Sequence, residues 1–187
     1  MTDIKTVFLD RDGVINPKRA EGDYVKRWEE FEFLPRAKEA LRLLCQAGLR
    51  LIIITNQRGI ARGLMTEADL RKIHQQMLDE LAEVGVRIDA LYCCPHEGGE
   101  CSCRKPQIGL FLQAQEDFPG IDFSRSVVIG DSLADMEAGA RLGHQVFLIA
   151  DPLHKDKMVE DARAGDIPID GVAQSLFDAV VQYVLVA

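Results

Sequence analysis

Short apolar segments alternate with longer amphipathic segments along most of the chain. Five of the short segments are dominated by apolar and often β-branched side chains. This pattern is typical of strands that are buried on both faces of a parallel sheet. We therefore expect β-strands at residues 6–9, 51–54, 88–92, 126–129 and 145–149.

Between the expected strands, apolar residues recur at the spacing of amphipathic helices. Pro35 suits a first helical position, Gly48 ends the pattern that follows it, and Thr66 and Ser175 are expected N-caps. We expect helices at residues 35–47, 67–84, 110–118, 133–142 and 176–184. Residues 151–170 are the least periodic part of the chain, and we expect a mobile connection near the surface there.

The alternation of strands and helices predicts an α/β fold, a doubly wound parallel sheet with helices on both faces. The chain has 187 residues, which is near the size of one ordinary domain. It shows no internal repeat, low-complexity tract or linker. We therefore expect a single domain over residues 1–187.

Composition and charge exclude several classes of protein. Hydrophobic residues make up 47% and charged residues 28%, which is ordinary for a globular protein and not for a disordered one. No signal peptide is visible and no apolar run reaches the roughly 18 residues of a membrane span, so we expect a cytoplasmic protein without a membrane partner. The net charge of −8 argues against a nucleic-acid partner. A monomer is expected.

Polar residues follow the expected strands at the edge where such sheets bind ligands. Asp10 and Asp12 follow the first strand, Thr55 the second, and Asp131 the fourth, while Lys105 lies beyond the third. Carboxylates suit Mg²⁺, and a carboxylate can attack phosphorus to form an aspartyl-phosphate. A second acid could protonate the leaving oxygen, and a lysine could neutralise the phosphoryl charge. The sequence therefore predicts phosphoryl transfer at this edge.

Each motif also has a plainer structural interpretation. An isolated Asp-x-Asp is usually a solvated turn, Lys105 alone would be a surface lysine, and Ser132 with Asp135 could be a helix capping box. The joint placement of these residues at successive strand ends favours the functional interpretation.

A cluster of cysteines and a histidine precedes Lys105. Cys94 and His96, followed by Cys101 and Cys103, could complete a tetrahedral zinc site with no position left open for catalysis. We interpret it as a structural zinc clip for the loop that carries Arg104 and Lys105. The alternatives are a redox cysteine pair or uninvolved thiols. Cys93 could compete with Cys94 as the ligand.

Four motifs of the chain, in their order, resemble those of the haloacid dehalogenase superfamily of phosphatases. They lie at residues 8–13, 55–57, 105–106 and 130–135, and the resemblance runs from residue 7 to about residue 149. It implies that Asp10 is the nucleophile and Asp12 the general acid and base. It also implies that Asp10, the main-chain carbonyl of Asp12 and Asp131 hold Mg²⁺, with Thr55 and Lys105 stabilising the phosphoryl group. Asp135 would lie near the metal.

Many members of this superfamily carry a cap domain inserted after the first or second motif. Here 45 residues separate Asp10 from Thr55, and 50 separate Thr55 from Lys105. The expected helices and strands use most of both intervals, so no cap domain fits. Substrate selection would then depend on residues 17–30 and on the Cys/His loop.

The Cys/His loop resembles two capless subfamilies, the D-glycero-D-manno-heptose 1,7-bisphosphate 7-phosphatases and the histidinol-phosphate phosphatases. The first acts in making nucleotide-activated heptose for lipopolysaccharide. The short spacing between His96 and Cys101 is nearer the second subfamily, whereas residues 55–67 and 22–33 look like the first. Because loops tolerate insertions, we weight these two stretches above the loop length.

The heptose resemblance implies a sugar phosphate substrate and a set of residues that bind it. Arg58 is in addition a hypothetical ligand of the second phosphate. The subfamily can carry a lysine after its last-motif aspartate, where this chain has Ser132. The expected substrate-binding residues are Arg11, Asn56, Gln57, Arg58 and Arg104.

The sequence leaves three other functional interpretations open. A polynucleotide 3′-phosphatase shares the motif that begins at Thr55, but the acidic balance of the chain counts against it. A phospho-receiver signalling domain also uses an acidic pocket on a doubly wound sheet. Such domains place the acceptor aspartate after the third strand, where this chain has Cys93 and Cys94. A non-catalytic zinc module would leave the acidic residues without a use.

Overall fold

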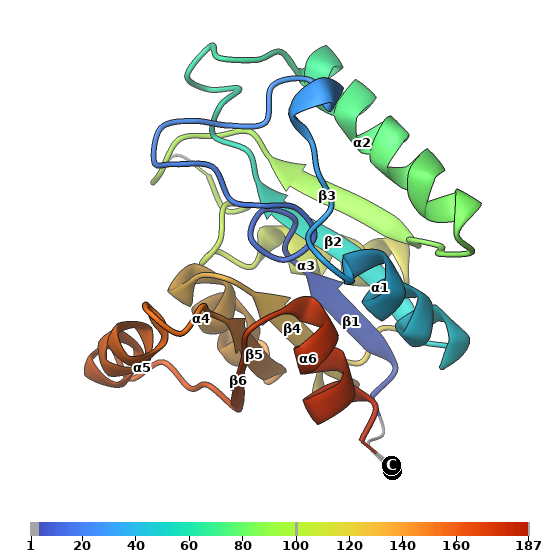
Figure 1. The fold of residues 1–187 in the computed structure, drawn as a ribbon. Coiled ribbons are helices and arrows are strands. Elements are labelled where there is room, and N and C mark those ends of the chain that lie inside the picture. Colours follow the sequence, from blue (N-terminus) through green and yellow to red (C-terminus); the bar gives the residue numbers. More distant parts are fainter. Residues whose placement is uncertain (1–3, 100, 187) are drawn as a thin grey trace.

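A six-stranded parallel sheet forms the centre of the computed structural model, which describes residues 4–99 and 101–186 (Figure 1). The strand order is β3-β2-β1-β4-β5-β6, and all neighbouring strands are parallel. This confirms the expected fold class. The strands are β1 (Thr6–Leu9), β2 (Arg50–Asn56), β3 (Ala90–Cys94), β4 (Ser126–Gly130), β5 (Gln145–Ile149) and β6 (Gly171–Ala173).

Helices cover both faces of the sheet. Side chains alternate between the faces along each strand, so Val7 and Leu9 lie in one hydrophobic core and Phe8 lies in the other. The first core packs against α1, α2 and α6, and the second against α3, α4 and α5. The helices are α1 (Ala37–Gln46), α2 (Glu67–Glu83), α3 (Gly109–Asp117), α4 (Leu133–Arg141), α5 (Lys155–Ala164) and α6 (Leu176–Ala179).

Local signals place most helix ends where the sequence predicts them. Thr66 and Asp69 form a reciprocal capping box at the start of α2, and Ser175 accepts a hydrogen bond from the N–H of Asp178 at the start of α6. A π-helical turn, Val180–Val184, continues α6. Only α1 begins later than predicted, because Arg36 has a left-handed φ of 60° and keeps the preceding proline in a turn.

The C-terminal third differs from the expectation. Residues 151–170, expected to be a mobile connection near the surface, contain α5, and β6 follows as a sixth strand. Of α5, Ala162 alone is buried, so the helix has almost no apolar stripe that a periodicity argument could detect. The three residues of β6 are too few to produce a recognisable pattern.

The intervals between the motif residues contain parts of this same layered fold. Within the described residues, α1 and β2 with a short 3₁₀ turn (Trp28–Glu30) lie between Asp10 and Thr55, and α2 and β3 lie between Thr55 and Lys105. This agrees with the absence of a cap domain. Among the same described residues, no helix has the length and apolar character needed to cross a membrane.

Candidate active site

The sheet register gathers the predicted site residues at one edge. Leu9 at the end of β1 pairs with Ile53 of β2 and Ile129 of β4, so the residues that follow these strands meet. The N–H of Asp10 donates to the carbonyl of Ile129 at 3.0 Å, which fixes the nucleophile candidate to the end of β4. Asp131 follows β4 directly.

Three carboxylates converge at this edge. Asp10, Asp131 and Asp135 each place an oxygen within 4.8 Å of the others. Two glycines make the approach possible: a Cβ on Gly13, whose φ is +86°, would lie 2.2 Å from Asp131 Oδ2, and a Cβ on Gly130 would lie 2.3 Å from the Asp135 Cβ. Hard oxygen ligands in such a cradle fit a magnesium ion.

Lys105 lies against the same carboxylates. Its Nζ atom is 3.0 Å from Asp10 Oδ1, 2.5 Å from Asp135 Oδ1 and 2.6 Å from the Ile54 carbonyl. Burial alone would lower the pKa of Lys105, but the two carboxylates outweigh it and raise the pKa. The Asn56 side chain holds the loop by accepting from the Lys105 N–H at 3.1 Å and donating to its carbonyl at 3.2 Å. Lys105 is therefore a buried, fixed cation beside Asp10.

The crowding of acids changes the ionisation of Asp10. Burial is the largest cause, and with the neighbouring Asp135 and Asp131 it raises the pKa of Asp10 to about 7, while Lys105 acts in the opposite direction. A bound divalent cation would favour the ionised, nucleophilic form of this carboxyl.

Asp12 is held in a different environment. Its carboxylate accepts four hydrogen bonds: two from Arg11 Nη2 at 2.9 Å, one from Asn16 at 2.8 Å and one from Gln57 at 2.7 Å. Burial alone would raise the pKa of Asp12, but the Arg11 charge and these hydrogen bonds hold it below its ordinary value. In the site without metal or substrate, the pKa values of these two acids are therefore shifted in opposite directions, that of Asp10 upward and that of Asp12 downward.

Arg11 and Gln57, which the sequence analysis expects to contact substrate, point into the protein. Both are fully buried, with 0% exposure, and neither lines the pocket. Gln57 Nε2 also donates to Thr55 Oγ1 at 2.9 Å, and Thr55 is buried as well. Arg11 and Gln57 therefore orient Asp12 and Thr55. The sequence places them next to the motif residues but does not fix the direction of their side chains.

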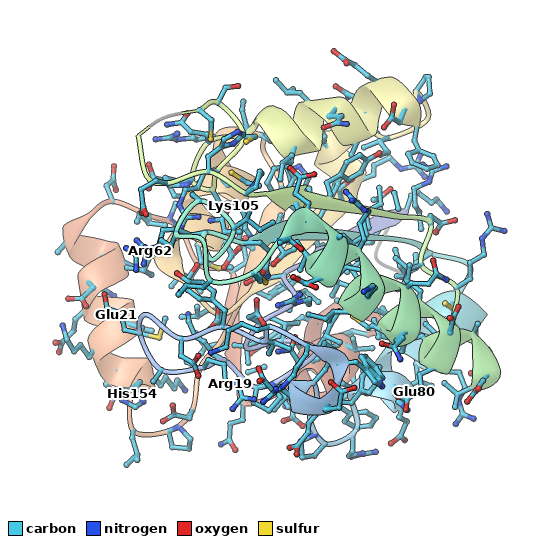
Figure 2. All side chains as sticks on the ribbon, turned by 90° about the horizontal axis from the view of Figure 1, so that it is seen from above. Arg19, Glu21, Arg62, Glu80, Lys105 and His154 are labelled. Carbon is cyan, nitrogen blue, oxygen red and sulfur yellow. The ribbon has the colours of Figure 1, made fainter. Side chains whose placement is uncertain are left out.

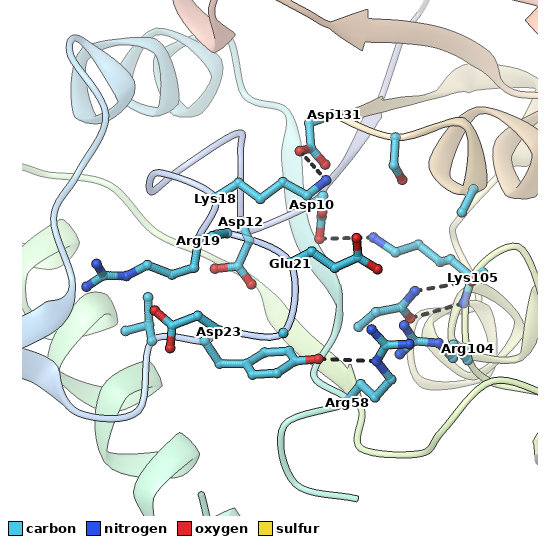
Figure 3. Close-up of a pocket in the computed structure, with 17 residues that line it drawn as sticks. Asp10, Asp12, Lys18, Arg19, Glu21, Asp23, Arg58, Arg104, Lys105 and Asp131 are labelled. Carbon is cyan, nitrogen blue, oxygen red and sulfur yellow. Dashed lines mark hydrogen bonds and ion pairs between the residues drawn. The ribbon is translucent and has the colours of Figure 1, made fainter. Parts of the chain in front are cut away.

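A pocket of about 560 Å³ opens over the acids (Figure 3). The loop at residues 18–25 forms one wall, and Asn56, Arg58, Arg104 and Ser132 contribute to the others. Figure 2 shows Lys105 nearer the middle of the molecule than Arg62, which lies outside the pocket. The pocket therefore combines an acidic floor with walls of mixed charge, which carry the basic residues Lys18, Arg19, Arg58 and Arg104 and the acids Glu21 and Asp23.

Contacts across the pocket connect its walls. Arg58 donates to the Tyr24 hydroxyl at 3.2 Å and to Glu97 at 3.1 Å. Lys18 Nζ lies 2.7 Å from Asp131 Oδ2. The Lys18 ammonium thus reaches Asp131 from the loop at residues 18–25. Next to Asp131, Ser132 caps α4 and shares a capping box with Asp135. The sequence points to this loop but not to the Lys18 contact.

The four predicted zinc ligands come together in the loop after β3. Five pairs among the Sγ atoms of Cys94, Cys101 and Cys103 and Nδ1 of His96 lie 3.1–3.6 Å apart. Ligands about 2.3 Å from a tetrahedral zinc would lie about 3.8 Å apart, so the set fits that ion with a small expansion. Cys93 is outside the group. Arg104 follows Cys103 directly and donates to the His96 carbonyl at 3.4 Å, so this loop shapes the pocket wall.

Two histidines that the sequence analysis does not assign to the site are buried. They are His74 and His144, and His74 Nε2 lies 3.0 Å from Arg11 Nη1. For His74 a signal existed, since it falls on the same helix face as Leu70 and Met77.

Comparison with known proteins agrees with this site. The family model for the polynucleotide kinase 3 phosphatase matches residues 5–165. A D-glycero-alpha-D-manno-heptose-1,7-bisphosphate 7-phosphatase of Mycobacterium bovis is 38% identical over 95% of this chain and 88% of its own length. The corresponding beta enzyme of Escherichia coli O6:H1 is 41% identical over 73% of this chain and 74% of its own length.

Solved structures give the same result. The D,D-heptose 1,7-bisphosphate phosphatase of B. bronchiseptica, complexed with magnesium and phosphate, superposes with a TM-score of 0.84 at 32% identity, covering 97% of this chain and 98% of that one. The D,D-heptose 1,7-bisphosphate phosphatase of Burkholderia thailandensis gives a TM-score of 0.70 at 34% identity, covering 97% and 99%. The chain therefore belongs to the polynucleotide kinase 3 phosphatase family of haloacid dehalogenase-type phosphatases.

Proposed function

We propose that this protein removes the 7-phosphate of D-glycero-D-manno-heptose 1,7-bisphosphate, a step in the supply of nucleotide-activated heptose for lipopolysaccharide. The observation that carries the proposal is the placement of Asp10 beside Lys105, with Asp12 in the same pocket and Arg58 and Arg104 on its walls. The heptose bisphosphate phosphatases that resemble the chain over nearly its whole length favour this substrate over other phosphate esters.

The chain's own side chains can carry a two-step reaction. In the first step an Asp10 oxygen bonds to phosphorus as the bond from phosphorus to the sugar O7 breaks, and Lys105 neutralises phosphoryl charge. The phosphate dianion that enters the pocket raises the pKa of Asp12, because like charges disfavour ionisation, and the Asp12 carboxylate takes up a proton from solvent as the substrate binds. Asp12 then gives its proton to O7.

In the second step Asp12, now a carboxylate, takes a proton from water. The water oxygen bonds to phosphorus as the Asp10 ester bond breaks, which releases phosphate and restores both acids. Thr55 and nearby main-chain N–H groups orient the phosphoryl oxygens in both steps. The arrangement needs Asp12 to be fixed, because O7 departs from, and the water later attacks from, the same side of phosphorus, opposite the Asp10 oxygen.

Two metal ions complete the proposal. Mg²⁺ held by Asp10, the main-chain carbonyl of Asp12 and Asp131 would supply positive charge that screens the carboxylate from the phosphate. Asp135 would orient Lys105 and cap α4, as its contacts indicate. The Cys94, His96, Cys101 and Cys103 set would hold a structural Zn²⁺, since four protein ligands leave no open position.

The second phosphate of the substrate matches the basic wall of the pocket. Arg58 and Arg104 line it together with Lys18 and Arg19. Arg58 donates from Nε to the Tyr24 hydroxyl and from Nη1 to Glu97, which holds its guanidinium in the pocket wall, where a phosphate could accept hydrogen bonds from it. A bisphosphate would thus span the pocket from the acidic floor to this wall.

The experiment that tests the proposal is Mg²⁺-dependent phosphate release from three substrate classes side by side. These are both anomers of the heptose bisphosphate, histidinol phosphate and a 3′-phosphorylated oligonucleotide. We expect the highest kcat/KM for a heptose anomer. A preference for histidinol phosphate would show that the short spacing between His96 and Cys101 is the better guide to substrate, and the heptose assignment would be wrong.

A further inference from the structure

A buried histidine lies behind the active site and outside the pocket. His74 belongs to α2, which covers the sheet face of the first hydrophobic core (Figure 1). It falls on the helix face of Leu70 and Met77, and its exposure is 8%. A polar residue at a core position is costly unless it has a partner. The partner of His74 is Arg11, at 3.0 Å between Nε2 and Nη1, although the two residues are 63 positions apart in sequence.

Arg11 depends on two anchors. Its side chain is fully buried, and Nη2 donates to both oxygens of Asp12 at 2.9 Å. Its Nε atom is buried without a hydrogen-bond partner. The guanidinium is planar, so a bond at Nη1 as well as at Nη2 fixes its rotation. Without His74, two of its three nitrogens would be buried and unpaired, and the group would turn to satisfy them.

The His74 imidazole suits the acceptor role. Arg11 donates only, so the bond requires a neutral histidine with its proton on Nδ1. Burial, assisted by the Arg11 charge, lowers the pKa of His74 to about 3. The acceptor is therefore present across the pH range in which a phosphatase of this type would work.

We propose that His74 is a positioning residue for leaving-group protonation: by fixing Arg11 it fixes the Asp12 carboxyl in the orientation that delivers a proton to the departing oxygen. The inference rests on the proposed function, since it assumes that Asp12 is the proton donor. His74 itself does not line the pocket. Asn16 and Gln57 still hold Asp12 when His74 is removed, so we expect the rate of leaving-group protonation to fall only in part.

Substitutions at position 74 separate the hydrogen bond from the bulk of the side chain. His74→Gln places an amide oxygen about where Nε2 lies and retains the acceptor. His74→Asn is also polar, but its side chain is one methylene shorter than that of Gln, so its amide does not reach Arg11. His74→Leu removes the acceptor altogether. His144→Leu is the matched control, because His144 is equally buried at 6% exposure but packs against Phe8, Phe111 and Phe123, away from the pocket.

The readout is the rate of the first turnover with enzyme in excess, on two substrates with different leaving groups. Heptose bisphosphate releases an alkoxide that needs a proton, whereas p-nitrophenyl phosphate releases a phenolate that does not. We expect His74→Asn and His74→Leu to slow the heptose reaction about tenfold, a part of the 10²–10⁴ typical of general acids, and the nitrophenyl reaction by less than about twofold. His74→Gln and His144→Leu should stay within about twofold of the wild type on both substrates.

Three results would overturn the proposal. The first is an equal fall in the first-turnover rate of His74→Asn on both substrates, which indicates a structural role. The others are an unchanged rate of His74→Asn on the heptose bisphosphate, or a His74→Gln variant as slow as His74→Asn. Should His74→Leu fail to fold, the Asn and Gln pair still decides. Failure of the proposed function is a separate result, because it would already appear as a lack of heptose bisphosphate turnover by the wild-type protein, before any variant is measured. In that case histidinol phosphate, also an alkyl phosphate, replaces the heptose in the same comparison.

Discussion

The Nζ atom of Lys105 lies 3.0 Å from Oδ1 of Asp10, in a site where both side chains are almost completely enclosed. Burial favours the neutral form of Asp10 and the ammonium opposes this, which leaves the pKa of Asp10 raised to about 7. Lys105 therefore opposes the effect of burial and favours the ionised, nucleophilic form of this carboxyl.

Replacing Asp10 with Asn should abolish turnover while the fold is retained. The amide cannot form the ester with phosphorus, and it relieves repulsion from Asp131 and Asp135, so the Tm without Mg²⁺ should not fall. Phosphate release and thermal unfolding measure the two effects. Asp161→Asn on the exposed face of α5 is the control and should behave as the wild type. Wild-type rates in Asp10→Asn would refute covalent catalysis at this residue.

The cysteine cluster should bind about one zinc per chain, because its four ligands fill a tetrahedral site. In protein purified without chelators, Cys103→Ser should lose most of the zinc and lower the Tm. Cys45→Ser and Cys93→Ser change cysteines outside the group and should keep the zinc. Elemental analysis of all four proteins measures this. Zinc-free wild-type protein, or equal zinc in Cys103→Ser, would contradict the structural clip.

Arg58 should be selective for the second phosphate. Arg58→Ala should reduce kcat/KM for the heptose bisphosphate about tenfold, the effect of one charged hydrogen bond, and leave a heptose 7-monophosphate almost unchanged. Arg62→Ala is matched, since Arg62 binds the same Glu97 at 3.0 Å but lies outside the pocket. It should affect neither substrate. An unchanged KM for the bisphosphate in Arg58→Ala would remove Arg58 from the substrate site.

His144 should make the fold sensitive to acid. Burial among phenylalanines lowers its pKa from 6.5 to about 4, so the folded state holds it neutral. The contribution of neutral His144 to the free energy of unfolding is intact above pH 6.5 and is lost as the pH falls from 6.5 toward 4. In this range the unfolded chain binds a proton at His144 and the folded protein does not. Relative to His144→Leu, the wild type should lose about 3 kcal/mol of unfolding free energy between pH 7 and pH 4.

Urea unfolding of the wild type and of His144→Leu at these two pH values measures that difference, since the carboxylates of the two proteins titrate alike. An equal loss in both would show that His144 is not held neutral by the fold.

The sequence predicts the parts of the fold that arise from local rules. Buried parallel strands have continuous apolar segments, and the capping box of Thr66 and Asp69 is visible as a spacing. Because parallel strands end at one edge, the meeting of Asp10, Asp131 and Lys105 also follows from their place in the chain. Strand β6 does not follow, because three residues carry too little pattern.

The direction of a side chain beside a motif is set by tertiary packing. Arg11 and Gln57 stand next to site residues, and nothing local distinguishes a pocket-facing arginine from one buried against α2. For His74, the helix spacing predicts that it lies on the buried face of α2. Its partner Arg11, in the loop after β1, cannot be predicted from the sequence because the contact depends on tertiary packing. The Lys18 contact with Asp131 likewise joins segments that only the complete fold brings together.

The most direct test of the central claim is phosphorus NMR of the product formed from heptose 1,7-bisphosphate with Mg²⁺. We predict loss of the 7-phosphate signal, retention of the anomeric phosphate and growth of inorganic phosphate in equal amount. Release of the anomeric phosphate first, or no release from either position, would contradict the proposed function.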